Sequence, residues 1–415
     1  MKVSRMVVRA AAMCGLFGAI GLVPPHATPA AAQSEPIVIA GSFDLSGAAA
    51  DVGKDVFEGV QYAMEVINGR GGVLGRRLEL RHQDNGTNPQ KSVDQATALI
   101  RDGAKFLLSP QSSANSIAVN KSVSAKLKMP TCVNTSNADD LSIKDFQPYI
   151  FVIGPNSYME GRAVASRLAR EPHRRYAVIS ADYAGGRANA NRFKEFIKEF
   201  NPNAEIVVEE YPKFGATDYT ASINKVLAAK PDYVWTVLFA ADLITFSKQA
   251  QAVGFFDQIG KRFIALYDGN TLKALGEAAV VGTDGWQRVP VNLVANGSPQ
   301  GKEYVAGFKA KHGRYPSDWT GLGYDCVMTW SQAAQAAGSI EADAVMAAIE
   351  TQEFQSVRGA FRFGKFDHQA EVPVFIGKVV QDKEFGQPLL DIVETIPGSK
   401  ARPSEEIVRK LRAAN

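Results

Sequence analysis

The stretch Ile67–Asp84, INGRGGVLGRRLELRHQD, predicts the fold, because it holds a helix end, a tight reversal and the start of a strand. The helix before it has one apolar stripe at a spacing of three to four residues, formed by Phe57, Val60, Met64 and Ile67. Asn68 and Gly69 should end that helix, and the glycines at 71, 72 and 75 allow the reversal. Residues 78–82 then alternate between apolar or aromatic and charged side chains, which is a strand period.

The segments on either side repeat this alternation. A strand is expected from Ile37, in IVIAGSFDLSG, and Asn88-Pro89 begins a second helix that stops at Gly103. The order strand, helix, strand, helix predicts an α/β fold in which a parallel sheet carries helices on its faces.

The segment Ile37–Leu141 resembles the first lobe of bacterial periplasmic amino-acid-binding proteins of the leucine/isoleucine/valine type. The shared features are the opening strand IVIAGSFDLSG, the helix running into IN-x-x-GG-x-x-G, the strand closing on Asp84 and the Asn88-Pro89 helix start. The resemblance continues less closely to about Val380. It implies the type I periplasmic binding protein clamshell: two Rossmann-like lobes with parallel central sheets, joined by a three-segment hinge.

The residues and the resemblance together divide the chain, the lobes and their crossings being implied by the resemblance. Residues 1–32 are expected to be a signal peptide. The first lobe should comprise residues 33–153 plus 288–366, and the second residues 154–287 plus 367–398. Residues 399–415 should form a C-terminal tail helix that starts at Pro403 and Ser404. The hinge crossings are expected near residues 154–155, 286–290 and 366–373.

The first residues are typical of an exported protein. A basic start with Lys2, Arg5 and Arg9 precedes an apolar run at 10–23 and the small residues 30–32. We therefore expect cleavage near Ala32 and a periplasmic location. Without the leader the 46 basic residues fall to 43, which equals the 43 acidic ones. This balance gives no reason to expect nucleic acid or a membrane as a partner of the mature chain.

Two cysteines follow the leader, Cys132 and Cys326. An oxidising compartment would permit a disulfide between them. Free cysteines are also common as small buried apolar groups, and we expect two separate thiols. The resemblance places the first-lobe disulfide of branched-chain binders at Thr87 and Ser112, so that particular bridge is absent.

Motifs for catalysis are missing. The segment 47–55, GAAADVGKD, has five residues between its glycine and the Gly-Lys pair, and Asp55 stands where a phosphate-binding loop needs Ser or Thr. The five histidines are dispersed and show no metal-ligand spacing. His368 is expected to be a structural, hydrogen-bonding residue. We expect no enzyme activity, no metal and no cofactor.

Ligand-binding residues are expected where parallel strands end. Ser112 and Ser113 follow the third strand and begin a helix, where hydroxyls and free backbone N–H groups suit a carboxylate. Simple N-capping by Ser113, without any ligand, is the alternative.

The resemblance assigns roles to further residues. Ser113 aligns with the family's carboxylate-binding serine, and Ser136 and Asn137 align with residues that hold the ligand's head group. Phe239 stands at an aromatic lid position, for which core packing is the alternative. Asp268 lies near the acidic residue that takes the ligand's ammonium, and Tyr267 competes for that position. Tyr183, in the segment after the strand at 176–180, completes the candidate set.

Three departures argue against leucine as the ligand. Val52 replaces a tryptophan, Gly185 replaces an aromatic residue, and Phe239 lacks the hydroxyl of the usual tyrosine. They suggest a differently shaped pocket, which leaves an aromatic carboxylate, an amide or another organic acid possible.

The resulting interpretation is a solute-binding protein that closes on a small polar organic ligand, an amino acid or a related carboxylate or amide. It would deliver that ligand to the permease subunits of an ABC importer. The alternatives are a sensory module read by a membrane receptor, a binder of aromatic carboxylates rather than amino acids, and a secreted enzyme.

Overall fold

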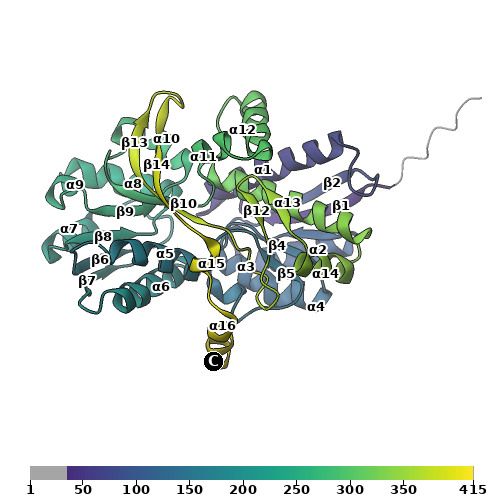
Figure 1. The fold of residues 1–415 in the computed structure, drawn as a ribbon, viewed down its shortest axis with the longest axis horizontal. Helices are drawn as coiled ribbons and strands as arrows, with labels where there is room; N and C mark the ends of the chain where they lie inside the picture. Colours follow the sequence, from purple (N-terminus) through teal and green to yellow (C-terminus); the bar gives the residue numbers. More distant parts are fainter. Residues whose placement is uncertain (1–34, 415) are drawn as a thin grey trace, which may run out of the picture. The chain divides into compact units, whose positions relative to one another are not determined.

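The computed structural model describes residues 35–414. The expected signal peptide therefore lies outside the described residues. Within them, the chain builds two large sheets with helices on their faces, in the half of Figure 1 that holds β1–β5 and the half that holds β6–β10. The helices and the strands alternate along most of the chain, as the first βαβ unit predicted.

The first sheet is parallel, with strand order β2-β1-β3-β4-β5. Its strands are β1 (Ile37–Phe43), β2 (Leu78–Asp84), β3 (Phe106–Leu108), β4 (Thr131–Val133) and β5 (Ile150–Val152). The helices between them are α1 (Ala50–Gly69), α2 (Pro89–Arg101), α3 (Ser113–Val119), the π-helical turn η1 (Asn120–Ser124), α4 (Ala125–Leu127) and the 3₁₀ turn η2 (Asp139–Leu141).

The stretch that predicts the fold has the expected structure. Helix α1 ends at Gly69, and the following glycines 71, 72 and 75 all have positive φ, which other residues adopt only with strain. The Asn68 side chain joins the helix end to the next strand, since its Nδ2 donates to Leu78 O at 3.0 Å and its Oδ1 accepts from Leu78 N at 2.7 Å. Asn88 caps α2 by accepting from Lys91 N.

The second sheet is mixed, with strand order β14-β13-β10-β9-β8-β6-β7. The strands β6 (Arg175–Ile179), β7 (Glu205–Glu210), β8 (Tyr233–Thr236), β9 (Phe263–Leu266) and β10 (Asp284–Gln287) are parallel. The expected strand near 374–380 is β13 (Val374–Asp382), and it pairs antiparallel with both β10 and β14 (Gln387–Ile396). The central strands of this sheet are parallel, as predicted, and β13 and β14 add an antiparallel edge.

The helices of this part of the chain are α5 (Ser157–Leu168), α6 (Ala184–Phe200), α7 (Thr220–Ala229), α8 (Ala240–Ala252), α9 (Phe255–Gln258), α10 (Gly269–Leu275) and the 3₁₀ turn η3 (Gly276–Ala278). None of the helices within residues 35–414 combines the length and the apolar character that a membrane span requires.

After β10 the chain returns to the first sheet. It forms α11 (Val291–Asn296), α12 (Pro299–His312), α13 (Asp318–Ala337), α14 (Ala342–Thr351) and the hairpin of β11 (Phe354–Ser356) with β12 (Gly359–Phe361). Helix α13 lies tightly against α1. A Cβ on Gly59 would approach Thr320 O to 2.1 Å, and a Cβ on Gly323 would approach Val56 O to 2.4 Å. Both positions therefore need glycine for the two helices to pack this closely.

The third passage between the sheets runs along the edge of the first. Val152 of β5 donates its N–H to His368 O at 2.9 Å, and it bridges to Gln369. His368 is buried, with Nδ1 2.8 Å from Ile150 O and Nε2 3.0 Å from Glu350 Oε1, so the prediction of a structural histidine is confirmed.

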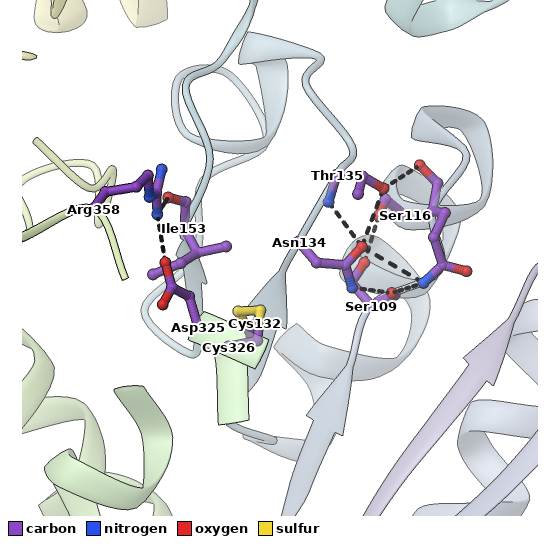
Figure 2. The surroundings of a disulfide bond; sticks show 10 residues. Ser109, Ser116, Cys132, Asn134, Thr135, Ile153, Asp325, Cys326 and Arg358 are labelled. Carbon is purple, nitrogen blue, oxygen red and sulfur yellow. Dashed lines mark hydrogen bonds and ion pairs between the residues drawn. A yellow bond between two sulfur atoms is a disulfide. The ribbon is translucent and has the colours of Figure 1, made fainter. Parts of the chain in front are cut away.

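The expectation of two separate thiols is wrong. Cys132 of β4 and Cys326 of α13 form a disulfide, with their Cα atoms 5.8 Å apart (Figure 2). The close packing of α1 against α13 positions Cys326 beside β4, a proximity that the sequence alone does not reveal. The bridge spans 194 residues, including the whole segment that forms β6–β10, so it joins two distant parts of the chain beside the first sheet.

The tail helix is present. It is α16 (Glu405–Ala413), and Ser404 caps it by accepting from Ile407 N, as predicted. A short helix α15 (Gly398–Ala401) precedes it.

Candidate functional site

A cavity lies where the two sheets face each other, and it contains about 400 Å³ of space that no atom of the chain fills, its opening included. Its lining residues are Ala49, Val52, Gln111, Ser112, Ser113, Thr135, Asn137, Tyr183, Phe214, Val237, Phe239, Leu266, Arg288 and Trp319. Apart from Trp319, at the start of α13, the lining residues come from segments at or after the carboxyl ends of parallel strands. This is where open parallel sheets bind ligands.

Five of the predicted site residues line this cavity: Ser112, Ser113, Asn137, Tyr183 and Phe239. The other three lie outside its lining. Ser136 is buried and its hydroxyl has no hydrogen-bond partner. Tyr267 is packed in the apolar core of the second sheet, where its ring lies against Gly285.

Asp268 has a local structural role. Its Oδ1 accepts from Asn270 N at 3.0 Å and from Thr271 N at 3.1 Å, and its Oδ2 accepts from the Thr271 hydroxyl. The carboxylate thus caps α10. Burial raises its pKa. It faces a second, open groove between α1 and α10 rather than the central cavity.

Asp44, which sequence reasoning missed, holds the loop that carries Ser112 and Ser113. Its carboxylate accepts from Ser112 N at 3.0 Å and from Asn115 Nδ2 at 2.7 Å, while its own N–H donates to Gln111 Oε1 at 2.9 Å. Burial raises the pKa of Asp44 to about 6, against these hydrogen bonds. The Ser112 N–H is therefore already hydrogen-bonded to Asp44, and the Ser112 side chain does not cap α3.

The ends of β3 and β4 are tied together beside this loop. Asn134 Nδ2 donates to Ser109 O at 2.8 Å, and the Thr135 hydroxyl donates to Gln111 O at 3.3 Å (Figure 2). These bonds place Thr135 next to Ser112 in the cavity wall.

Four aromatic rings complete the lining, three from segments that follow strands of the second sheet and Trp319 from the start of α13. Tyr183 stacks on Phe214 with ring centroids 4.6 Å apart, and Phe239 lies 6.1 Å from Tyr183 and 6.3 Å from Trp319. Gly185 makes room for this cluster, because a Cβ there would come within 2.9 Å of the Tyr183 ring and 2.6 Å of Ser113 Oγ. Tyr183 takes up the space that an aromatic residue at position 185 would need.

A buried ion pair closes the inner end of the cavity. Arg288 follows β10 and is 2% exposed, and Glu160 of α5 is 1% exposed. Arg288 Nε and Nη2 donate to the two oxygens of Glu160 at 2.7 and 3.1 Å, and Nη1 donates to Thr135 O at 3.0 Å. Asn137 Nδ2 also donates to Glu160 at 2.9 Å. No sequence spacing connects residues 160 and 288, so sequence reasoning missed this pair.

The two walls touch across the mouth of the groove. Asn270 of α10 donates to Asp55 of α1 at 2.5 Å, and Asp55 also binds Arg314 at 2.9 Å and the Ser317 hydroxyl at 2.6 Å. A chain of polar contacts thus joins the helices of the first sheet to α10 of the second. This arrangement is that of a closed clamshell.

Asp318 makes the stability dependent on pH near neutrality. Its buried carboxylate accepts from Arg288 N at 2.8 Å and Val289 N at 2.9 Å, and burial raises its pKa from 3.8 to about 7. Between pH 4 and pH 7 the folded state therefore binds more protons at Asp318 than the unfolded state does. This group's contribution to the free energy of unfolding must fall as the pH rises.

We expect the melting temperature of Asp318→Asn, relative to that of the wild type, to be higher at pH 7.5 than at pH 5, because the variant has no carboxyl to ionise. Burial lowers the pKa of His173 and of His312, so their contributions to stability rise as the pH rises. Both histidines are present in the wild type and in the variant, so their effect cancels in the comparison. Thermal unfolding of both proteins at the two pH values checks this. A difference in melting temperature that is the same at pH 5 and 7.5 would contradict the raised pKa.

The fold and the cavity define a two-lobed ligand-binding protein. A model of the periplasmic binding protein family matches residues 36–384. The chain belongs to the periplasmic binding protein family, which is a substrate-binding transport family and not an enzyme family. Among residues 35–414 no group of three or more His, Cys, Asp or Glu side chains is arranged to hold a metal ion.

Named relatives agree with this assignment. The chain is 25% identical over 364 residues to the Leu/Ile/Val-binding protein homolog 4 of Brucella abortus (strain 2308), covering 84% of this chain and 85% of the relative. A solute binding protein of an ABC transporter from Rhodopseudomonas palustris BisB5, solved in complex with 3,4-dihydroxybenzoic acid, has a TM-score of 0.79 at 20% identity and covers 88% of this chain and 98% of its own.

A third relative was solved in a closed conformation. It is the leucine-, isoleucine-, valine-, threonine- and alanine-binding protein of Brucella ovis, with a TM-score of 0.76 at 23% identity, covering 89% of this chain and 97% of its own. These structural similarities show the clamshell fold.

Proposed function

We propose that the protein captures a small organic carboxylate, preferably an aromatic one, between its lobes and delivers it to the permease subunits of an ABC importer. The names of the relatives support transport of either an amino acid or an aromatic acid. The observation that carries the choice is the cavity lining, which contains four aromatic rings, one guanidinium and no carboxylate.

An α-amino acid would place its ammonium in this lining without a charged partner. Burying an unpaired ammonium costs several kcal/mol. The one carboxylate expected to serve, Asp268, instead caps α10 and faces the outer groove. An acid without an amine avoids this cost.

An aromatic acid matches both walls of the cavity. Its carboxylate would lie at the polar end, near Ser112, Ser113 and Asn137, where Arg288 contributes the only positive charge of the lining. Its ring would lie among Tyr183, Phe214, Phe239 and Trp319, because aromatic rings favour stacked or edge-on neighbours at such distances. All eight predicted ligand residues stay predictions, and Ser136, Tyr267 and Asp268 lie outside the cavity lining.

Calorimetry with benzoate, 3,4-dihydroxybenzoate, leucine and valine tests the ligand class. We expect an aromatic acid to bind best. Ser113→Ala should weaken its binding by about 1–2 kcal/mol, the scale of one hydrogen bond to a charged group. Asp268→Asn should leave binding unchanged within about twofold, because Asp268 lies outside the cavity lining and the amide oxygen of the variant can still accept from the α10 N–H groups.

The amino-acid interpretation makes the opposite prediction. If leucine or valine binds best and Asp268→Asn weakens that binding by about 3 kcal/mol or more, the ammonium lies at Asp268 after all. That result would overturn the aromatic-acid proposal and leave the binding-protein family assignment intact.

Export and hinge closure complete the proposal. The leader 1–32 would direct the chain to the periplasm, and N-terminal sequencing of exported protein should begin at Gln33. We keep the lobe boundaries proposed from the sequence, 33–153 plus 288–366 and 154–287 plus 367–398. Ligand would shift the population towards the closed arrangement through contacts with both lobes. A membrane receptor in place of the permease would use the same closed surface.

A further inference from the structure

The last residues of the chain lie beyond the part that matches the family. The family model ends at residue 384, whereas α15 and α16 occupy Gly398–Ala401 and Glu405–Ala413. In Figure 1 this yellow segment follows β14, passes α15 near the centre of the view and ends at α16 at the bottom. We call residues 397–414 the tail.

The tail begins on the second lobe. Helix α15 packs against α5, and Arg162 Nε of α5 donates to Lys400 O at 3.3 Å. Ala401 is fully buried. A Cβ on Gly398 would approach the carbonyl carbon of Glu371 to 2.5 Å, so the tail backbone lies directly against the third passage between the sheets.

An ion pair anchors the tail at that passage. Arg402 Nη2 donates to Asp367 Oδ1 and Oδ2 at 2.8 and 3.0 Å, and Nη1 donates to Glu371 Oε2 at 3.4 Å. The Asp367 side chain is 1% exposed and that of Arg402 10% exposed. Forked contacts of this kind fix the geometry of an arginine more firmly than a surface ion pair does.

The tail ends on the first lobe. Arg412 Nε donates to Ile143 O at 2.8 Å, and its Nη2 donates to Ser142 O at 3.2 Å and to Phe366 O at 2.7 Å. Its guanidinium also lies 4.7 Å from the ring centroid of Phe146. Val408 of α16 is fully buried. The last turn of α16 is therefore docked on the loop between β4 and β5.

We propose that the tail is a strap that connects the two lobes a fourth time and favours the closed arrangement. The strap is held at α5 of the second lobe and at the 142–146 loop of the first, with Arg402 fixed between them. Any opening of the lobes that moves α5 relative to the 142–146 loop would break at least one set of these contacts. The contacts described here are made while α10 touches α1 across the groove, that is, with the clamshell closed.

The distance between the lobes in ligand-free protein tests the strap. Spin labels at two exposed helix positions, introduced as Asp94→Cys on α2 and Lys248→Cys on α8, report the distance without interference from the disulfide-bonded cysteines. The strap is weakened by Arg412→Gln, and its α16 portion is removed by a stop codon after Arg402. Arg409→Gln is the matched control, because Arg409 is exposed and, among residues 35–414, pairs with Glu405 of its own helix and with no group of the other lobe.

We expect the truncated chain and Arg412→Gln to lower the ligand-free population at the short distance by about threefold or more, and Arg409→Gln to leave it unchanged. Ligand affinity should fall by the same factor, since the binding-competent fraction falls. Identical distance distributions in all four proteins would overturn the strap. The distances are measured without ligand, so this outcome does not depend on which ligand the protein carries.

Discussion

Replacing both Cys132 and Cys326 with alanine is expected to destabilise the protein by about 5 kcal/mol, the chain-entropy value for closing a loop of this length. The bridge spans 194 residues and joins β4 to α13. These two elements pack beside the same sheet but are separated in the sequence by the segment that forms β6–β10. Without the bridge, the unfolded chain gains the freedom to separate them.

Urea unfolding of the double variant, with the dithiothreitol-reduced wild type alongside, measures this loss. The reduced wild type is the control for the small cavity that alanine leaves, because it retains both sulfur atoms. The double variant and the reduced wild type should lose a similar amount of the free energy of unfolding. A double variant within about 1 kcal/mol of the oxidised wild type would show that the bridge contributes little, since removal of native disulfides commonly costs 2–5 kcal/mol.

Glu160→Gln is expected to destabilise the protein by about 3–5 kcal/mol, because it leaves the guanidinium of Arg288 buried without its hydrogen-bonded counter-charge. The amide oxygen that remains at position 160 and Thr135 O can still accept from Arg288, but both are neutral. The reverse change, Arg288→Gln, should cost a similar amount by leaving the buried Glu160 carboxylate without its guanidinium partner, with Asn137 Nδ2 and the new amide as neutral donors.

A double-mutant cycle checks the origin of this cost. Glu160→Gln combined with Arg288→Gln removes both charges, so its loss in the free energy of unfolding should be well below the sum of the single losses. Glu199→Gln is the matched control that should cost under about 1 kcal/mol, because Glu199 is exposed and pairs with Arg162 at the surface. Additive single losses would mean that the two charges do not compensate each other in the folded protein.

The parts of the fold that the sequence predicts correctly depend on contacts between residues that are close in the sequence. The stop at Asn68 and Gly69, the cap at Asn88-Pro89 and the cap at Ser404 are all contacts within a few residues, and they appear as expected. The carboxyl ends of β3, β4, β6 and β8 carry five of the predicted site residues, because strand ends in a parallel sheet converge whatever the loop sequence.

The features that were missed depend on contacts between distant segments. The Cys132–Cys326 bridge requires α13 to lie on β4. Gly59 and Gly323 permit this packing, but no spacing of residues in the sequence indicates it. The pairing of Arg288 with Glu160 depends on two different passages between the lobes. The resemblance places Asp268 near the residue that takes the ligand's ammonium, and this role stays a prediction; the sequence did not indicate that Asp268 also caps α10.

If the closed lobes enclose an organic acid that carries no amine, the bound molecule itself should reveal it. Native mass spectrometry of the purified protein, followed by release and identification of the bound small molecule, is the decisive measurement. We expect a monocarboxylic acid with an aromatic ring, in one copy per chain. Release of an α-amino acid in that stoichiometry would contradict it, and the partner of the ammonium would then have to be sought at Asp268.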